Sequence, residues 1–485
     1  MKIAGLHLLK IVTASVLLLF VQHASRVQAG EIADRVITAV QVLQAEGKLG
    51  QNPVLRLMVK KGNLSNFTGD SFQLKRRWEK QTGVQLDIQV MPQQASLDLI
   101  RTDKDVDLAV ARNREFPDLY NQGLVLDLVP LMHKYGFTLD SDTESGFILP
   151  EKQVYFGDRI IGIPADNDIA LLYLRRDMLE ADEYKAAFRE RYGQELAAPN
   201  TWDDYLRLVE FFNHPEKGFY GSLEPRNEST AWMYWMPRYL SKGDPVRYLF
   251  DDAMQPLIDS PEGIKATKEY LSTITYAPPK LLRHGNDYNF TLPLFRYGQG
   301  FSTIITAAGA KIFNIEGSPV RGKFAVYLMP GDLIDGKLIR RTTYIYGNNM
   351  VITSSSKNSD LAFLYAMWLT DPDISTQSIV SSGGFSDPYR FNHLKQPSIR
   401  KRYSSQLIDA LVEQINIAVP AGTGLPGDTE YISVLNENLR RAVTGAITAT
   451  EAMQLTATAW EEITERHGRN QQIGHLQVFR RHFPQ

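Results

Sequence analysis

The sequence predicts an α/β protein built from two lobes. Its 485 residues exceed the size of one ordinary domain, and hydrophobic residues make up 43% of the chain, enough for more than one core. Strand-like and helix-like segments alternate after residue 50, which favours parallel strands joined by crossover helices. Two extended segments with polar interruptions, at 160–168 and 344–353, are the expected crossings between the lobes.

The first lobe is expected to begin with alternating strands and helices. Residues 31–50 carry apolar side chains at helical spacing and predict an N-terminal helix ahead of the lobe. The polar stretch 60–69 is expected to be a loop, and 72–81 a helix that Gly83 ends. Short apolar runs predict three strands, at 54–59, 84–90 and 105–110.

The second half of the chain adds strands and then becomes helical. Apolar runs predict strands at 169–174 and 300–306, and Thr201 is expected to cap a helix, with Asp204 completing an acidic variant of the capping box. Glycine and amides interrupt the strand expected at 344–353, which is typical of a bulge or a close approach. The later helices are expected at 359–370, 408–414, 431–444 and 450–467.

The N-terminus and the cysteine count indicate a secreted chain. Lys2 and Lys10 flank the start of an apolar stretch at 11–21, and small residues at 27–29 offer a cleavage site, so residues 1–29 are expected to be a signal peptide. The apolar stretch is shorter than the roughly 20 residues that span a membrane. The absence of cysteine excludes disulfides, thiolate metal sites and a lipid anchor on cysteine. We therefore expect a periplasmic protein.

The charge balance argues against a polyanionic partner. Lys and Arg number 53 and Asp and Glu 55, which gives a net charge of −2. This leaves no basic excess that would bind nucleic acid or an acidic membrane surface. The charged residues are spread along the chain, as on an ordinary solvated surface. No nucleic-acid partner is expected.

The order of these segments resembles that of the family 1 extracellular solute-binding proteins of ABC importers, the class that contains maltose-binding and other sugar-binding proteins. The resemblance covers roughly residues 53–470, and it rests on the shared order and spacing of several short sequence motifs. These motifs are WEKQTGV at 78–84, GLVLDL at 123–128, GIP at 162–164, LYLRRD at 172–177, PNTWDD at 199–204, the strand at 300–306, and the closing helix pair with TEAM at 450–453.

This resemblance implies the two-lobed periplasmic-binding-protein fold, with a ligand cleft that closes about hinge crossings. It assigns 30–52 to an N-terminal helical extension, 53–164 and 353–395 to the first lobe, and 165–352 and 396–485 to the second. It also implies a monomeric, non-enzymatic protein that captures a small polar solute, expected to be a mono- or oligosaccharide. The partner would be the transmembrane permease of an ABC importer.

Segment 223–239 contains the first candidates for ligand contact. A sugar site needs aromatic platforms beside polar partners. The family places a Glu-Pro pair followed by aromatic residues in the cleft, and Glu224 and Pro225 match that pair, with Trp232 after it. The alternative interpretation is a helix on which Trp232 and the aromatic residues three and seven positions later form a core stripe.

Polar residues at the crossings are the other candidates. Asp166, Asn167 and Asp168 follow the first crossing strand, where the family often places ligand contacts, although a solvated hinge turn is the alternative. Two aspartates without further spaced oxygen ligands do not make a calcium site, so no metal is expected. The remaining candidates for ligand contact are Asn63, Tyr346, Asn348 and Phe385.

Enzyme motifs fail on their context. Residues 422–427 fit G-x-G-x-x-G, but they come late in the chain and Pro426 stands where a helix should continue, so a loop is expected. The chain has no G-x-S-x-G elbow, P-loop or H-E-x-x-H, and its nine histidines are scattered. No catalytic residue or cofactor is expected. A secreted carbohydrate-active hydrolase or lyase, and a binding protein that serves a sensory receptor, remain the alternatives.

Overall fold

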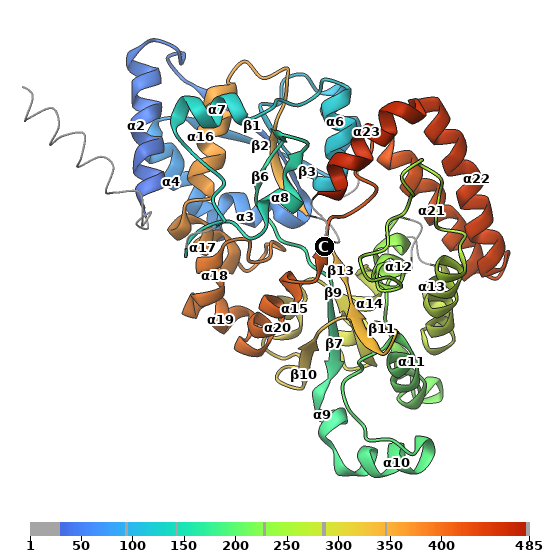
Figure 1. Ribbon diagram of the computed structural model, residues 1–485. Helices are drawn as coiled ribbons and strands as arrows, with labels where there is room; N and C mark the ends of the chain where they lie inside the picture. The colour runs from blue at the N-terminus through green and yellow to red at the C-terminus, as the bar shows by residue number, and fades with distance from the viewer. Residues whose placement is uncertain are drawn as a thin grey trace, which may run out of the picture.

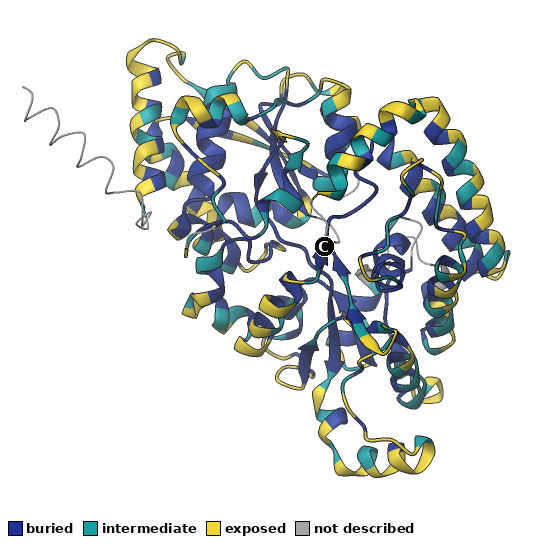
Figure 2. Ribbon diagram, in the orientation of Figure 1, coloured by how far each residue is buried: buried dark blue, intermediate teal, exposed yellow. Residues whose placement is uncertain are grey.

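Two sheets organise the chain into two lobes (Figure 1). The computed structural model describes residues 30–92, 96–141, 144–226, 229–283, 288–344 and 347–481. The five-stranded sheet of the first lobe has the order β2-β1-β3-β14-β6, and the four-stranded sheet of the second has the order β10-β7-β9-β8. The inner strands of both sheets are largely buried, whereas the edge strand β2 and the outer faces of the peripheral helices are largely exposed (Figure 2).

The first sheet combines parallel and antiparallel pairs. β1 (Val54–Lys60) runs parallel to β2 (Gln85–Met91) and β3 (Leu108–Arg112). β14 (Asn348–Ile352) returns from the second lobe and runs antiparallel to β3 and to β6 (Ile163–Pro164). Because β1 and β3 end at the same edge, the polar residues that follow them lie together beside the second lobe.

The N-terminal helix is part of the core of the first lobe. α2 (Glu31–Ala45) packs on α16 (Ser359–Leu369) and α4 (Gln73–Thr82). The helix ends earlier than the expected residue 50, and the backbone N–H of Ala33 donates to Asp371 Oδ2 at 3.2 Å. Its buried face consists of Ile32, Ala33, Val36, Val40 and Leu43.

The second lobe packs helices beside a mixed sheet. β7 (Leu171–Arg175) runs antiparallel to β9 (Gly300–Ile305) and β10 (Phe324–Tyr327), and β8 (Tyr220–Ser222) runs parallel to β9. The capping box expected at Thr201 is confirmed. The main helices are α11 (Trp202–Phe211), α12 (Ala231–Leu240), α13 (Pro261–Ser272), α21 (Asp428–Val443) and α22 (Ala449–His467).

None of the helices in the described residues is long and apolar enough to cross a bilayer. The remaining elements are short or peripheral. These elements are β4 (Tyr155–Phe156), β5 (Arg159–Ile160), β11 (Gly331–Ile334), β12 (Lys337–Arg340), β13 (Thr342–Thr343), β15 (Ala418–Val419), α5 (Ser96–Thr102), α6 (Phe116–Asn121), α7 (Val129–Tyr135), α8 (Pro150–Gln153), α9 (Arg176–Glu180), α10 (Asp182–Tyr192), α14 (Tyr288–Arg296), α15 (Gly309–Phe313), α17 (Pro372–Val380), α18 (Phe391–Lys395), α19 (Pro397–Tyr403), α20 (Ser405–Ile415), α23 (Arg469–Arg480), and the 3-10 turns η1 (Lys61–Asn63), η2 (Asp70–Phe72), η3 (Asn113–Glu115), η4 (Pro215–Lys217), η5 (Thr273–Tyr276) and η6 (Pro279–Arg283).

Two crossings connect the sheets at one place. The first leads from β6 to β7, and the second leads from β13 to β14. They meet as antiparallel neighbours at Ile169 and Tyr344. Of the single strand expected at 344–353, the structure has β14 at 348–352, whereas β13 ends before this segment and pairs with β15. Gly347, just before β14, has a φ of +53°, which is unfavourable for residues with a side chain.

The structure corrects two further expectations. Residues 60–69 are not a loop: they form η1 and α3 (Leu64–Thr68), because Asn66 and Phe67 are buried and the Asn66 side chain donates to the carbonyl of Ser378. The strand expected at 105–110 lies at 108–112, since Asp107 accepts the N–H of Arg56 and holds the turn before it.

The boundaries of the lobes remain a prediction, but sheet pairing bears on one of them. The expected return to the first lobe was at residue 353, whereas Asn348 to Ile352 already pair with β3 of the first sheet. The chain therefore rejoins that sheet before Asn348. The expected signal peptide, residues 1–29, lies outside the described residues.

The docking of α2 predicts a measurable contribution to stability. Leu43 is 4% exposed, whereas its neighbour Val42 is 49% exposed. We expect Leu43→Ala to lower the free energy of unfolding by about 2–4 kcal/mol, because it removes buried methyl groups and leaves a cavity. Val42→Ala should change it by less than about 0.5 kcal/mol. Urea unfolding followed by circular dichroism measures both, and equal effects would contradict the docking of this helix.

Candidate functional site

A buried polar cluster lies where the crossings meet the end of β1. The side-chain amide of Asn348, the first residue of β14, is its centre. Lys60 Nζ donates to Asn348 Oδ1 at 2.8 Å, and Asn348 Nδ2 donates to Asp166 Oδ2 at 3.2 Å and to Asp168 Oδ2 at 3.1 Å. All four residues are at most 3% exposed. One amide thus joins the first strand of the first lobe to both crossings.

The segment after α17 adds a third carboxylate to this cluster. The backbone N–H of Asp387 donates to Asp166 Oδ1 at 2.7 Å, and Asp387 Oδ2 accepts the N–H of Ala307 at 2.9 Å. Ala307 follows β9 of the second lobe. Beside them, Lys311 Nζ donates to the carbonyl of Ile379 at 2.6 Å. The cluster therefore also reaches the second sheet.

Burial shifts the pKa of the charged groups in the cluster toward their neutral forms. Burial first, and then the charges of Asp166 and Asp387, raise the pKa of Asp168 well above its ordinary value. Burial also raises the pKa of Asp166 and of Asp387. Desolvation lowers the pKa of Lys60 and that of Lys311 to about 7 each.

Three carboxylates in this cluster have the spacing of metal ligands. Oxygen atoms of Asp166, Asp168 and Asp387 lie within 4.8 Å of one another. The positive charge that acts on them comes from lysine side chains, because Lys60 lowers the pKa of Asp168 and Lys311 lowers that of Asp387. Within the described residues, hydrogen bonds join these groups, and the two lysines act on the carboxylates through their charge.

A narrow crevice with a free volume of about 30 Å³ runs between the lobes next to the cluster. Gln153 links the two features, because it lines the crevice and its Nε2 donates to Asn167 Oδ1 at 3.4 Å. The N–H of Asn113, another lining residue, donates to the carbonyl of Gly347 in the second crossing at 3.0 Å. The lining residues are Asn113, Arg114, Phe116, Pro117, Lys152, Gln153, Tyr155 and Phe156 on one side, and Pro420, Ala421, Gly424 and Phe479 on the other.

Arg114 connects the two sides of this crevice. Its Nη1 donates to Asp428 Oδ2 at 3.0 Å, at the first residue of α21, and its guanidinium carbon lies 5.8 Å from the centre of the Trp232 ring. Its Nε is buried and has no hydrogen-bond partner among the residues that the structure describes. Asp118 of α6 accepts the N–H of Gly427 at 2.6 Å, so a carboxylate of the first lobe lies at the N-terminus of α21, where the helix dipole favours negative charge.

The structure brings several of the predicted ligand residues together. Asp166, Asp168 and Asn348 form the cluster, and the backbone of Asn167 donates to Asp166. Asn63 lies near the Asp387 segment, since its Nδ2 donates to Ser386 Oγ at 3.2 Å. The side chains of Asp166, Asp168 and Asn348 contact one another. The contact of these residues and of Asn63 with a ligand remains a prediction.

Trp232 and Phe385 lie apart from the cluster, and Tyr346 lies outside the described residues. Trp232 is fully buried in α12, as the core interpretation expects, and it also faces Arg114 across the crevice. Phe385 is 45% exposed, and its N–H donates to the carbonyl of Gly62 at 3.0 Å.

Glu224 is buried in an ion cluster of the second lobe. Its carboxylate contacts Arg238 at 3.0 Å and Arg226 at 3.5 Å, and all three side chains are fully buried. Burial acts to raise the pKa of Glu224, but the two guanidinium groups outweigh it and hold the pKa below its ordinary value. Glu224 does not line the crevice described above, and its predicted ligand contact remains a prediction.

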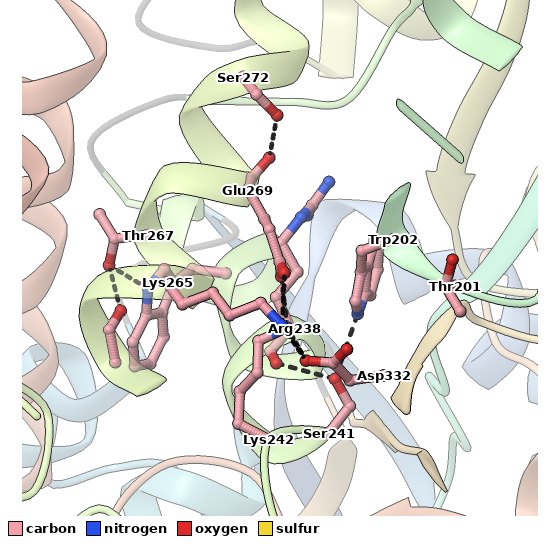
Figure 3. A network of polar contacts seen from close by, with 12 residues as sticks. Thr201, Trp202, Arg238, Ser241, Lys242, Lys265, Thr267, Glu269, Ser272 and Asp332 are labelled. Carbon is pink, nitrogen blue, oxygen red and sulfur yellow. Dashed lines mark hydrogen bonds and ion pairs between the residues drawn. The ribbon is translucent and has the colours of Figure 1, made fainter. Parts of the chain in front are cut away.

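A second ion network supports the same part of the lobe (Figure 3). Lys242 Nζ lies between Glu269 at 2.5 Å and Asp332 at 2.9 Å, with only 1% of its side chain exposed. Nearby, the guanidinium of Arg238 lies over the Trp202 ring at 4.2 Å. These contacts join α13 to β11 through Lys242, which follows α12, and they join α12 to α11.

Sequence analysis missed Lys60, Arg114, Asp387 and Asp428. Lys60 and Arg114 had a usable signal, because they lie at the carboxyl ends of β1 and β3, where polar residues of α/β proteins gather around ligands. Asp387 lies in a late loop and Asp428 is the first residue of α21, and the approach of both to the first lobe depends on how the chain returns between the lobes.

The chain belongs to the bacterial extracellular solute-binding protein family, whose family model matches residues 68–375. This family consists of transport proteins that bind solutes and is not a class of enzymes. A curated relative, a probable amino-acid ABC transporter periplasmic-binding protein of Sinorhizobium fredii named y4oP, is 26% identical over 254 residues. The match covers 50% of this chain and 51% of the relative, so the chain spans about half the length of that relative.

Solved structures share the two-lobed periplasmic-binding-protein fold. An ABC transporter solute-binding protein of Agrobacterium radiobacter K84 in complex with ribitol has a TM-score of 0.71 and 18% identity, covering 85% of this chain and 98% of that one. Maltose-bound MalE3 of T. maritima has a TM-score of 0.69 and 18% identity, covering 84% and 99%. A protein of Agrobacterium vitis S4 with bound D-mannitol has a TM-score of 0.64 and 17% identity, covering 86% and 99%. At these identities the likeness shows the fold.

The Asn348 amide should be essential to the cluster. We expect Asn348→Ala to lower the free energy of unfolding by about 2–4 kcal/mol, because it leaves Lys60 without its acceptor and two buried carboxyl groups without a donor. Asn121→Ala, on an exposed residue of the same lobe, should change it by less than about 0.5 kcal/mol. Chemical unfolding tests both, and a loss for Asn348→Ala no larger than that of the control would disprove the bridge.

The raised pKa of Asp168 predicts a pH-dependent stability. Its folded pKa lies above the unfolded value of about 3.9, so its contribution is complete below about pH 3.9 and is lost as the pH rises through the folded pKa. Asp168→Asn cannot ionise, and we therefore expect its free energy of unfolding to increase relative to the wild type between about pH 4 and about pH 7. Urea unfolding over this range measures the difference, and a pH-independent difference would refute the shift.

Proposed function

We propose that this protein captures a carbohydrate or polyol in the crevice between its lobes and delivers it to the membrane permease of an ABC importer. The observation that carries this proposal is the composition of the crevice, which combines polar groups of Asn113, Arg114 and Lys152 with the rings of Phe156 and Phe479. Polyols and sugars present both hydroxyl groups and apolar faces, so they need both kinds of partner.

Arg114 is the proposed polar anchor of the solute. Its Nε is a buried donor without a partner, and Nδ2 of the adjacent Asn113 is another. Buried donors without partners are costly, and hydroxyl oxygens of a solute would satisfy them. The contacts of Arg114 with Asp428 and Trp232 would then hold the solute between both lobes.

Hinge closure about the two crossings is the proposed mechanism of capture. The crossings are adjacent at Ile169 and Tyr344. Among the contacts between the lobes, η3 and α6 of the first lobe pack against α21 of the second. Opening would separate Arg114 from Asp428 and admit the solute, and closing would bury it on both sides. The proposed place of this cycle is the periplasm, after removal of residues 1–29.

The relatives guide the choice of test compounds. Solved structures with this fold contain ribitol, maltose, D-mannitol and α-D-tagatose. We expect one compound of this chemical class to raise the melting temperature of residues 30–485, because a solute at about 100 times its Kd stabilises the fold by about 2.7 kcal/mol. Chemical analysis after incubation should recover the compound unchanged. Conversion of the compound would contradict a pure binding role, and a thermal shift with amino acids alone would contradict the carbohydrate assignment.

Arg114 should contribute directly to the affinity. We expect Arg114→Ala to raise the Kd of the stabilising solute by about 10-fold to 100-fold, the range for a lost hydrogen bond to a charged donor. Arg101→Ala is the matched control, because Arg101 is an exposed arginine of the first lobe that pairs with Asp98. Isothermal titration calorimetry measures both values. The same Kd for the two variants would show that Arg114 does not bind the solute.

A further inference from the structure

The C-terminal helix α23 is anchored on the second lobe. Gln472 Nε2 donates to the carbonyl of Pro426 at 2.7 Å, and Arg480 Nη2 donates to the carbonyl of Phe250 at 2.6 Å. The guanidinium of Arg480 also lies 4.3 Å from the centre of the Tyr248 ring. These contacts fix both ends of the helix, so the direction in which its other side chains project is determined.

The same helix contacts the first lobe. The ring of His475 stacks on Phe156 of β4, with centroids 5.3 Å apart and an interplanar angle of 19°. One turn further on, Val478 lies 3.7 Å from the position that a Cβ on Gly157 would occupy. Figure 1 shows α23 close to α6 of the first lobe and to α22 of the second. The helix therefore bridges the two lobes.

Phe479 of this helix forms part of the crevice wall opposite Phe156. Its ring lies directly on the backbone of Gly424, where a Cβ would come within 2.2 Å of the ring. Gly424 has a φ of +69°, so both the space and the backbone conformation favour glycine there. The loop before α21 is thus shaped to receive this aromatic ring.

We propose that α23 forms part of the solute site and helps to hold the lobes closed. In this arrangement Phe479 supplies the aromatic wall on the second lobe, opposite Phe156, and the stack of His475 on Phe156 favours the closed position of the lobes. The inference rests on the proposed function and extends it to residues 469–481, which lie beyond the family segment at 68–375. When the lobes open, a solute with an apolar ring or chain face would pack against these phenylalanine rings.

Two variants on one helix test this proposal against a matched control. Phe479→Ala removes the wall and His475→Ala removes the stack, whereas Gln477→Ala changes an exposed side chain between them. Because the chain has no cysteine, a single pair of dyes on Lys80→Cys and Glu190→Cys, one exposed site on each lobe, can report the distance between the lobes. Melting temperatures establish that each variant folds.

We expect Phe479→Ala and His475→Ala to lengthen the mean dye distance without solute, whereas Gln477→Ala should match the unmutated labelled protein. For the compound that stabilises the wild type, Phe479→Ala should raise the Kd about 10-fold, and Gln477→Ala should not.

If no ribitol, maltose, D-mannitol or D-tagatose binds the wild type, the proposed function fails, and the dye distance still decides the role of α23. Phe479→Ala and His475→Ala variants with the dye distance of Gln477→Ala would overturn the proposal. If Phe479→Ala does not fold, His475→Ala decides the outcome.

Discussion

The side-chain amide of Asn348 is the contact on which the arrangement of the lobes depends. An amide can accept and donate at the same time, and this one accepts from Lys60 while it donates to Asp166 and Asp168. The crossings carry Asp166, Asp168 and Asn348, and these polar residues are buried between the two lobes. Buried polar groups are tolerated only when they are paired, and the Asn348 amide supplies hydrogen bonds to these groups.

The crevice follows from this constraint and from the topology of the first sheet. Parallel β1 and β3 end at one edge, which places Lys60 and Arg114 side by side with the crossings. The opposite wall includes the loop before α21. At the start of α21, Asp428 meets Arg114, and Asp118 of the first lobe caps the dipole of the helix. Charge complementarity thus acts across the crevice and favours a closed arrangement.

Local signals in the sequence were sufficient for much of the fold. The apolar runs that form β1, β7 and β9, the capping box at Thr201 and the polar residues after Pro164 each depend on neighbours within a few positions. The helical turns at 60–69 did not follow from local signals, because burial of Phe67 and the contact of Asn66 with α17 stabilise them. Tertiary contacts outweigh a polar composition there.

The sequence by itself determined the α/β class, the two lobes, the placement of the first crossing and the resemblance to solute-binding proteins, because these depend on periodicity and on the order of segments. Only the tertiary structure decided which polar residues meet. Asp387 reaches Asp166 across 221 positions, and Arg114 reaches Asp428 across 314. Glu224 matched a ligand motif but pairs with Arg238 inside the second lobe. The physical reason is that contact between distant charges depends on how the chain returns between the lobes, which local sequence does not encode.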